Sequence, residues 1–228
     1  MRARLVESRE IAPGTRHFEF EALDWQAAFV PGQFLSVTAT IGEDEITRAY
    51  SIASPPDGKR FAFCANLVQD GRLSPFLFHL KPGDEIGFKG PYGAFILRRP
   101  VSDSILVATG TGIAPFRSIL LARVREHPDR QFTLIFGVRH EHGLLYHNEW
   151  LTLTEELPNF DYRPTLTRPP DSWTARTGRV QQHVMEALGG RRDLDVYICG
   201  LREMVDDVRT KLKETGLDRK RIIYEKYD

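Results

Sequence analysis

The chain has 228 residues, 41% of them hydrophobic, and its 31 Lys and Arg are balanced by 31 Asp and Glu. This length allows one large domain or two of modest size, and the lack of a basic excess argues against a nucleic-acid-binding protein. No uninterrupted apolar run reaches the length of a membrane span or of a secretion-signal core. We therefore expect a cytoplasmic protein without membrane insertion and without a nucleic-acid partner.

Residues 1–99 contain short strand-like pieces separated by Pro-Gly and Asp-Gly turn signals. This spacing predicts an antiparallel β-barrel or sandwich. A short helix is expected near Ser74, because Ser74 resembles an N-cap and Pro75 a first-turn proline. The expected strands include His17–Phe20, Gln33–Thr38, Arg60–Ala65 and Glu85–Phe88.

After Pro100 the pattern changes to an alternation of strands and helices, which predicts a doubly wound parallel sheet. We expect an antiparallel β-barrel domain over residues 1–99 followed by an α/β domain over residues 100–228. The expected strands are Ser104–Thr109, Gln131–Gly137, Phe160–Leu166, Asp195–Cys199 and Arg221–Tyr227. The expected helices are Pro115–Glu126, 143–157, Gly178–Leu188 and Glu203–Thr215.

A glycine-containing segment joins the first strand of the second half to its helix. Glycines let the backbone approach a pyrophosphate, and the helix start supplies unpaired N–H groups and a favourable dipole. A tight turn without a ligand is the alternative, but the position at the start of a strand–helix unit favours dinucleotide binding. The expected contacts are Thr109, Gly110, Thr111, Gly112 and Pro115.

Arginines follow the next two strands, where a site for NAD would place an acidic residue. The second strand leads into Arg139, and Arg168 and Arg179 belong to the following strand–helix unit. A guanidinium can pair with a ribose 2′-phosphate, so these residues favour NADP(H) over NAD(H). All three are ordinary solvated arginines under the alternative reading.

Four segments resemble, in this order, the ferredoxin–NADP reductase superfamily of FAD-containing reductases: Arg48–Ser51, Gly71–Ser74, Thr109–Pro115 and Val196–Met204. The resemblance implies that Arg48 meets the FAD pyrophosphate and that Tyr50 packs on the isoalloxazine. It also implies that Ser51 lies near flavin N5. The implied flavin-site residues are Arg48, Ala49, Tyr50, Ser51, Cys64, Ala65, Asn66, Gly71, Leu73, Ser74 and Tyr227, and those near the nicotinamide are Cys199, Gly200 and Met204.

Structural roles are the alternatives for several of these residues. Arg48 and Tyr50 fit an ordinary exposed and buried pair on a strand, and Ser74 fits a helix cap. For Cys64 a buried structural thiol is the preferred interpretation. The two cysteines cannot supply a four-thiolate cluster, and solvated histidines are favoured over a metal site at His140, His142 and His147, so no metal is expected.

The final residues resemble the end of plant-type reductases, in which a glutamate precedes a terminal tyrosine by two positions. The resemblance implies that Tyr227 stacks over the flavin and leaves when the nicotinamide enters. Glu225 is expected near the reacting atoms with Ser51 and Cys199. The sequence departs from that pattern by one extra residue, Asp228.

The implied reaction is hydride transfer from NADPH to flavin N5, followed by single-electron transfer to ferredoxin or flavodoxin. The catalytic residues would be Ser51, Cys199, Glu225 and Tyr227, none of them a covalent nucleophile. One alternative is an NAD(P)H-dependent flavin or quinone reductase or an oxygenase reductase component, which the stretch from Trp173 to Val180 also resembles. Another is an FAD-holding electron-transfer subunit, although such subunits typically add a cysteine cluster after the nucleotide domain. The sequence indicates neither the direction of electron flow nor the oligomeric state.

Overall fold

A computed structural model describes residues 1–227, and Asp228 lies outside the described residues. The chain divides into two compact units. The first unit comprises Met1–Ile96 and Ala114–Ala122, and the second comprises Leu97–Ile113 and Arg123–Asp228. Each has its own hydrophobic core and is described separately.

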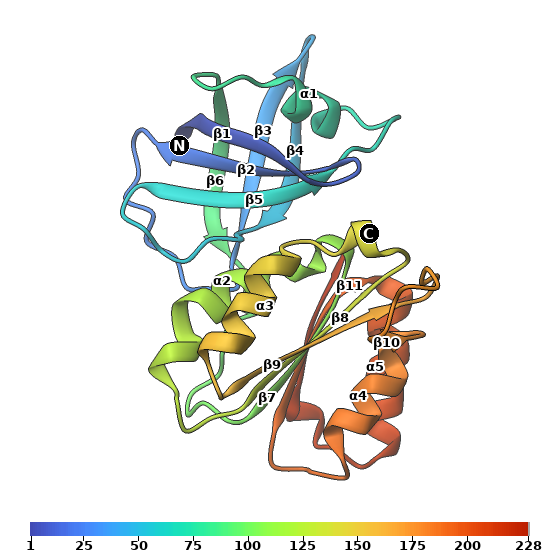
Figure 1. The fold of residues 1–228 in the computed structure, drawn as a ribbon. Helices are drawn as coiled ribbons and strands as arrows, with labels where there is room; N and C mark the ends of the chain where they lie inside the picture. Colours follow the sequence, from blue (N-terminus) through green and yellow to red (C-terminus); the bar gives the residue numbers. More distant parts are fainter. Residues whose placement is uncertain (228) are drawn as a thin grey trace. The chain divides into compact units, whose positions relative to one another are not determined.

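The first unit is built on an antiparallel six-stranded sheet of order β4-β3-β6-β1-β2-β5 (Figure 1). Its two edges meet, because Ala53 N–H, just after β4, donates to Ala62 O of β5 (2.7 Å). The ring of Tyr50 also stacks on Phe63 with centroids 4.7 Å apart. The sheet therefore closes into a barrel, as the turn spacing predicts. The strands are β1 (Arg2–Ala12), β2 (Thr15–Ala22), β3 (Phe34–Ile41), β4 (Asp44–Ser51), β5 (Arg60–Asn66) and β6 (Glu85–Tyr92).

Aromatic rings fill this barrel. Phe18 and Phe20 of β2 lie opposite Phe63 and Phe61 of β5 in the strand register. All four rings are buried, and neighbouring centroids lie 5.4 to 5.8 Å apart. Each such ring removes on the order of 150–250 Å² of surface from water, so these cross-strand pairs stabilise the barrel.

Two strands of the barrel were not predicted. In β4 nearly every side chain is exposed or half-buried, so its sequence lacks the alternation that marks a strand with one buried face. In β1 the buried positions are Ala3 and Leu5, near its start, and the rest is largely polar. Backbone pairing with neighbouring strands determines both elements.

The short helix α1 of the first unit corrects one detail of the sequence interpretation. α1 (Leu73–His79) has Arg72 as its N-cap residue, and Ser74 is already inside the helix. The Ser74 hydroxyl instead accepts from the backbone N–H of Val68 (3.0 Å). It therefore closes the loop before the helix instead of capping the helix end.

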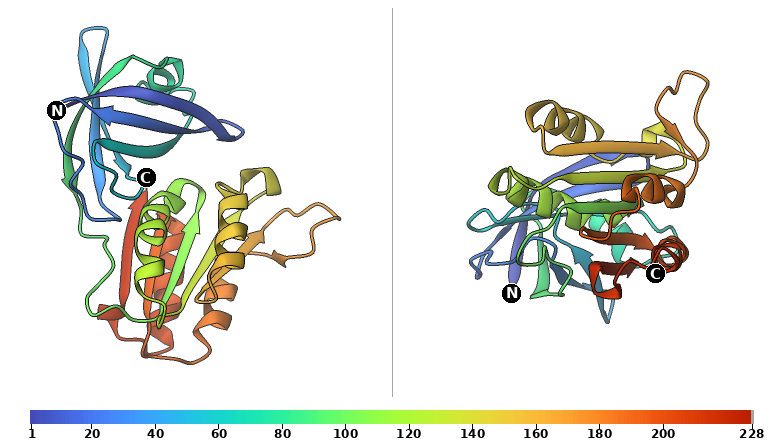
Figure 2. Two further views of the ribbon diagram at one scale, coloured as in Figure 1. Left: turned by 60° about the vertical axis from the view of Figure 1, so that its left-hand side comes forward. Right: turned by 90° about the horizontal axis from the view of Figure 1, so that it is seen from below.

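The second unit contains a six-stranded parallel sheet of order β10-β9-β8-β7-β11-β12 (Figures 1 and 2). α3 lies on one face, and α4 and α5 lie on the other (Figure 2). The predicted doubly wound architecture is thus confirmed, and β10 is an addition to it. The strands are β7 (Ser104–Thr109), β8 (Phe132–Val138), β9 (Phe160–Leu166), β10 (Arg176–Thr177), β11 (Asp195–Leu201) and β12 (Ile222–Tyr227). Its helices are α3 (His147–Glu156), α4 (Val180–Leu188) and α5 (Arg202–Glu214), and its short turns are η1 (Gly110–Ile113), η2 (Val124–Glu126), η3 (Glu141–Gly143) and η4 (Arg219–Arg221). The helix α2 (Ala114–Arg123) belongs, up to Ala122, to the first unit.

Alternate residues of the central strands face the two helical layers. Val196 and Ile198 of β11 join the core formed with α4 and α5, to which Val205 belongs. The residues between them, Tyr197 and Cys199, therefore point to the opposite face. Among residues 1–227, no helix is long and apolar enough to cross a membrane.

Candidate functional site

The turn after β7 combines an open glycine with a tightly packed one. Gly110 has φ +53°, and a Cβ placed on it would meet nothing within 4 Å. A Cβ on Gly112 would lie only 2.3 Å from the carbonyl oxygen of Cys199. Gly112 therefore lets η1 lie directly on the end of β11, while Gly110 leaves backbone accessible to a ligand.

Gly200 allows a second close approach at the same edge of the sheet. Its φ is +147°, and a Cβ there would lie 2.4 Å from Thr109 Oγ1 and 2.9 Å from the Met204 methyl group. Thr109 Oγ1 is buried and has no hydrogen-bond partner among the residues the structure describes. An orphaned hydroxyl beside open glycine backbone at the start of α2 fits the binding of a phosphate-containing ligand such as a nicotinamide dinucleotide.

Cys199 and Glu225 are neighbours on adjacent parallel strands. Cys199 of β11 pairs with Ala108 of β7 on one side and with Glu225 of β12 on the other. Its side chain is fully buried. The register also sets Tyr227 opposite Leu201. These residues therefore lie near the carboxyl ends of parallel strands, which is the edge where such sheets bind ligands.

Side-chain contacts with α5 hold β12 in place. Lys226 Nζ lies 2.8 Å from an oxygen of Asp206, and this pairing lowers the pKa of the Asp206 carboxyl. The guanidinium of Arg209 lies 3.6 Å from the centroid of the Tyr224 ring. Residues up to Lys226 are thereby attached to the body of the second unit.

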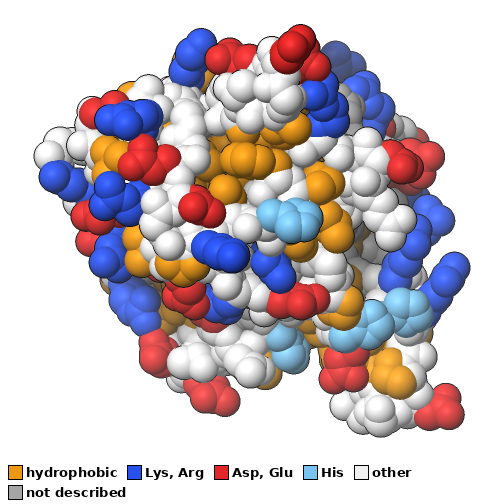
Figure 3. All heavy atoms as spheres, turned by 90° about the horizontal axis from the view of Figure 1, so that it is seen from above, with side chains coloured by type: hydrophobic (Ala, Val, Ile, Leu, Met, Phe, Trp, Pro, Cys, Tyr) orange, Lys and Arg blue, Asp and Glu red, His pale blue; other side chains and the backbone are white. Residues whose placement is uncertain are grey.

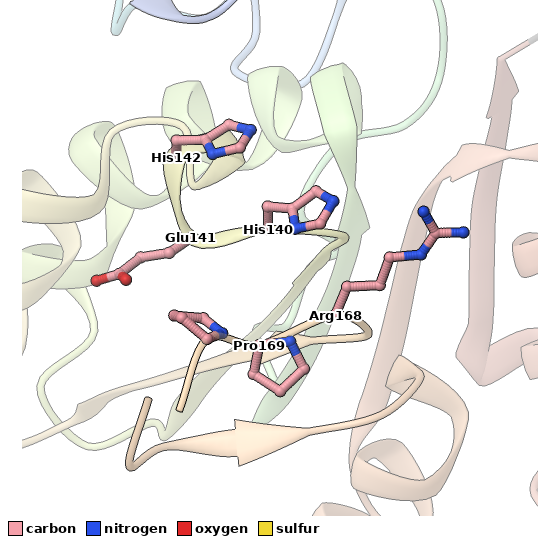
Figure 4. Close-up of a pocket in the computed structure, with 6 residues that line it drawn as sticks. His140, Glu141, His142, Arg168 and Pro169 are labelled. Atoms are coloured by element: carbon pink, nitrogen blue, oxygen red, sulfur yellow. The ribbon is translucent and has the colours of Figure 1, made fainter. Parts of the chain in front are cut away.

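A pocket of about 640 Å³ opens beside the ends of β8 and β9 (Figure 4). Of the three predicted phosphate-binding arginines, Arg168 lines it, whereas Arg139 and Arg179 are not among its lining residues. The backbone N–H of Arg168 donates to Arg139 O (2.8 Å), and Arg179 is the exposed N-cap residue of α4. The remaining lining residues are His140, Glu141, His142, Pro169 and Pro170.

The three histidines of this region have different surroundings. His140 and His142 stack with centroids 5.3 Å apart and planes 15° apart. His147 is half-buried, and its Nδ1 lies 3.1 Å from the Tyr162 hydroxyl. Burial lowers the pKa of His147 against the opposing effect of Glu141, so the expectation of a solvated histidine is wrong there. Among residues 1–227 no group of three His, Cys, Asp or Glu could hold a metal ion.

The flavin motif, Arg48–Ser51, forms the last four residues of β4. Arg48 is exposed, and its guanidinium donates to Thr47 O (2.8 Å). One face of the Tyr50 ring is occupied by Phe63, and burial raises the pKa of Tyr50 to about 12, so its hydroxyl keeps its proton at neutral pH. Ser51 is buried, and Ala49 between the motif side chains is exposed.

The second flavin segment is a compact turn leading into α1. Gly71 N–H donates to Val68 O (2.9 Å), and a Cβ on Gly71 would lie 3.0 Å from that same oxygen. Larger residues would therefore strain the turn. Leu73 and Ser74 are buried under it.

The β5 segment carries Cys64, Ala65 and Asn66. Cys64 is buried and lies opposite His17 in the strand register, with Ala65 buried beside it. Asn66 ends the strand, and its Oδ1 accepts from Thr15 Oγ1 (2.7 Å). This pair joins the start of β2 to the end of β5.

Two residues of α2 that the sequence analysis did not single out hold the chain just after the flavin motif. Arg117 donates to Ala53 O (2.7 Å), and the fully buried Ser118 donates to Ser54 O (2.7 Å). No spacing in the sequence indicates these contacts. They follow from the packing of α2 within the first unit.

Comparison with known proteins defines the class. The chain matches the family models for an oxidoreductase FAD-binding domain over residues 2–96 and an oxidoreductase NAD-binding domain over residues 106–210. It is therefore a two-domain flavoenzyme that uses FAD and a nicotinamide dinucleotide. The chain belongs to the ferredoxin–NADP reductase superfamily of FAD-containing reductases.

Its relatives support that assignment along nearly the whole chain. Ferredoxin–NADP reductase B of Sorangium cellulosum is 38% identical, with 99% of this chain and 97% of that protein covered. The toluate 1,2-dioxygenase electron transfer component of Pseudomonas putida is 33% identical, but the match spans only 60% of it. A ferredoxin NADP⁺ reductase from Neisseria gonorrhoeae, solved with bound FAD and NADP, has a TM-score of 0.86 and 26% identity, with 99% and 98% of the two chains covered.

Proposed function

We propose that this protein exchanges hydride between NADP(H) and FAD and single electrons between FAD and a ferredoxin or flavodoxin. The observation that carries the proposal is the packing of η1 on Cys199 and Gly200, with Glu225 on the adjacent strand. In this proposal the backbone of η1 binds phosphate, and the neighbouring side chains orient the nicotinamide. The ferredoxin–NADP reductase relative, matched over nearly its full length, supports the choice of electron carrier.

The residues have separate roles in this proposal. Thr109–Pro115 bind the dinucleotide pyrophosphate, while Cys199, Gly200, Met204 and Glu225 orient the nicotinamide. Arg48, Gly71 and Ser74 bind the flavin phosphates, and Tyr50, Ser51 and the Cys64–Asn66 strand segment bind the rest of FAD. Tyr227 covers the flavin until nicotinamide arrives. Bound together, the two cofactors supply hydride-transfer chemistry, and the protein contributes position and electrostatics.

A preference for NADPH rests on Arg168 in the pocket, supported by Arg139 and Arg179 nearby in the chain. Guanidinium groups bind phosphate bidentately and carry charge at every physiological pH. We further propose that the FAD-binding domain comprises residues 1–99 and the nucleotide-binding domain residues 100–228, and that the protein is cytoplasmic.

Anaerobic reduction of the FAD-loaded protein tests both parts. NADPH should bleach the flavin absorbance faster than NADH at equal concentration, and the reduced protein should then reduce ferredoxin or flavodoxin. Equal rates with NADH would overturn the arginine argument. No bleaching with either nucleotide would overturn the catalytic role and favour an FAD-holding subunit.

An oxygenase reductase component is the second candidate. The toluate dioxygenase relative favours it, as does the ferredoxin reductase of carbazole 1,9a-dioxygenase, which has a TM-score of 0.87 at 25% identity. In that case NADH should bleach the flavin efficiently. Electrons should then pass to an oxygenase-linked iron–sulfur protein faster than to flavodoxin.

A further inference from the structure

Residues 52–54, which we call the joint segment, follow the flavin motif and lie where the barrel closes. The N–H of Ala53 donates to Ala62 O of β5 (2.7 Å), and the Ser54 hydroxyl accepts from Ala62 N–H (3.0 Å). Ile52 and Ala53 are fully buried. The joint segment thereby connects the two strands that carry the implied flavin contacts, β4 with the flavin motif and β5 with residues 64–66.

The chain just after the joint segment offers no further backbone donors. The next two residues are Pro55 and Pro56, and proline has no backbone N–H. The carbonyl oxygens of Ala53 and Ser54 still need partners, because a buried acceptor without a hydrogen bond lowers stability. Their donors must therefore come from another element.

Helix α2 supplies both donors. The guanidinium of Arg117 donates to Ala53 O (2.7 Å), and the hydroxyl of the fully buried Ser118 donates to Ser54 O (2.7 Å). Two consecutive side chains of one helix thus hold two consecutive carbonyl groups. This contact fixes the direction of the joint segment as well as its position.

Arg117 also influences the other side of the joint. His17 is a buried residue of β2 and lies opposite Cys64 of β5 in the strand register. Burial lowers the pKa of His17, and the positive charge of Arg117 lowers it further. Arg117 therefore acts after β4 through a hydrogen bond and beside β5 through its charge.

We propose that Arg117 and Ser118 are positioning residues for FAD, and that by holding the joint segment they set the spacing between the flavin motif and residues 64–66. The inference rests on the proposed function, since FAD contacts both segments there. Hydride transfer requires the reacting atoms to be held within about 3–3.5 Å in the right orientation. Loss of either donor should therefore change the binding and the reactivity of FAD, in addition to any loss of stability.

Ser118→Ala removes one donor with little change in side-chain volume. Dilution of the FAD-loaded variant, followed by the fluorescence of released flavin, should show FAD binding weakened about threefold to tenfold, because Ser54 O loses its partner. The visible circular dichroism of bound FAD should change. In anaerobic stopped-flow reduction, the rate at saturating NADPH should fall about threefold or more, while the NADPH concentration that gives half the maximal rate stays the same.

Substitutions of Arg117 give an independent test in case Ser118→Ala folds poorly. Arg117→Met removes the donor and its charge, so it should reproduce the loss of FAD affinity, the change in dichroism and the slower reduction. Lysine keeps a charged donor on a flexible chain, although it lacks the planar fork of arginine. Arg117→Lys should therefore retain more FAD affinity than Arg117→Met.

Ser104→Ala and Arg123→Met are the matched controls. Ser104 is a buried serine of β7 that donates to a backbone carbonyl (2.9 Å), and Arg123 ends α2 and pairs with Glu126 (2.7 Å). Both should change only the free energy of unfolding, measured in urea. If the Arg117 and Ser118 variants also change only that free energy, the positioning role is overturned.

Failure of the proposed function would give a different result. No reduction of the unmodified protein by NADPH or NADH would overturn hydride exchange. The affinity and the dichroism of FAD do not depend on that reaction, so they would still decide whether Arg117 and Ser118 position the flavin.

Discussion

His17 is a buried titratable side chain in the wall of the first unit. It lies on β2 and is 5% exposed. Burial, with smaller contributions from Arg117 and Arg9, lowers the pKa of His17 from 6.5 to about 3. The folded protein therefore keeps this imidazole neutral, while the unfolded chain protonates it below pH 6.5.

This difference predicts a loss of stability in mild acid. Between pH 6.5 and about 3 the unfolded state binds one more proton than the folded state does. The free energy of unfolding therefore decreases as the pH is lowered, by at most about 1.4 kcal/mol per pH unit from this group. In His17→Phe that contribution should disappear. Urea unfolding at pH 7 and pH 5 measures it, with the exposed His79→Gln as control. An unchanged pH dependence in His17→Phe would contradict the prediction.

At the scale of single elements, η1 is defined by two glycines with different surroundings. Gly112 is needed because of packing on Cys199, whereas Gly110 has open space and a positive φ. The sequence shows both as members of one motif. Only the atoms around each glycine show that Gly112 is required for packing and that Gly110 leaves space for a ligand.

Alanine substitutions should separate these two roles. Gly112→Ala places a Cβ 2.3 Å from Cys199 O, so η1 or β11 must shift, and unfolding free energy should fall by about 1–3 kcal/mol. Gly110→Ala should cost only about 1 kcal/mol, from strain at positive φ. Gly112→Ala should also weaken the binding of a nicotinamide nucleotide more than tenfold, which corresponds to a loss of about 1.4 kcal/mol or more of binding free energy. Gly190→Ala, with φ +78° and nothing within 4 Å, controls for backbone strain. Equal losses in all three would show that packing on Cys199 is unimportant.

The predicted strands and helices illustrate where element-level reasoning works. Ser104–Thr109 and Phe160–Leu166 have the predicted bounds. The first is an apolar run that ends at turn residues, and the second begins with buried aromatic residues that alternate with half-buried charged ones. The sequence did not predict β4, because most side chains of this strand are exposed. The prediction that Ser74 caps the helix was wrong, because its hydroxyl accepts a hydrogen bond from Val68 in the preceding loop. Both errors arise from contacts that the residue pattern within the element does not show.

At the scale of the whole molecule, each unit has its own core and its own cofactor motif. The cores are the aromatic barrel and the layer formed by α4 and α5 on the parallel sheet. Acidic and basic side chains are interspersed over the face shown in Figure 3, in keeping with the zero net charge. Binding to a folded unit stabilises that unit by mass action.

Calorimetric unfolding of the FAD-free protein should therefore respond differently to the two cofactors. FAD at about 100 times its dissociation constant should add about 2.7 kcal/mol to the first unit, and NADP⁺ at the same ratio should do so for the second. Arg48→Met should reduce the shift caused by equal FAD concentrations and leave that of NADP⁺. A single transition that both cofactors raise equally would show instead that the units unfold together.

The sequence by itself determined the two-domain order, the parallel sheet, the cofactor motifs and the class of chemistry. Hydrophobic periodicity and turn residues are local, and motif residues keep their order along the chain. Tertiary structure alone decided that Arg117 and Ser118 hold the chain just after the flavin motif, and that His140 and His142 stack in a pocket with Arg168. These contacts join residues from different elements, and strand register and packing, which no local pattern specifies, bring them together.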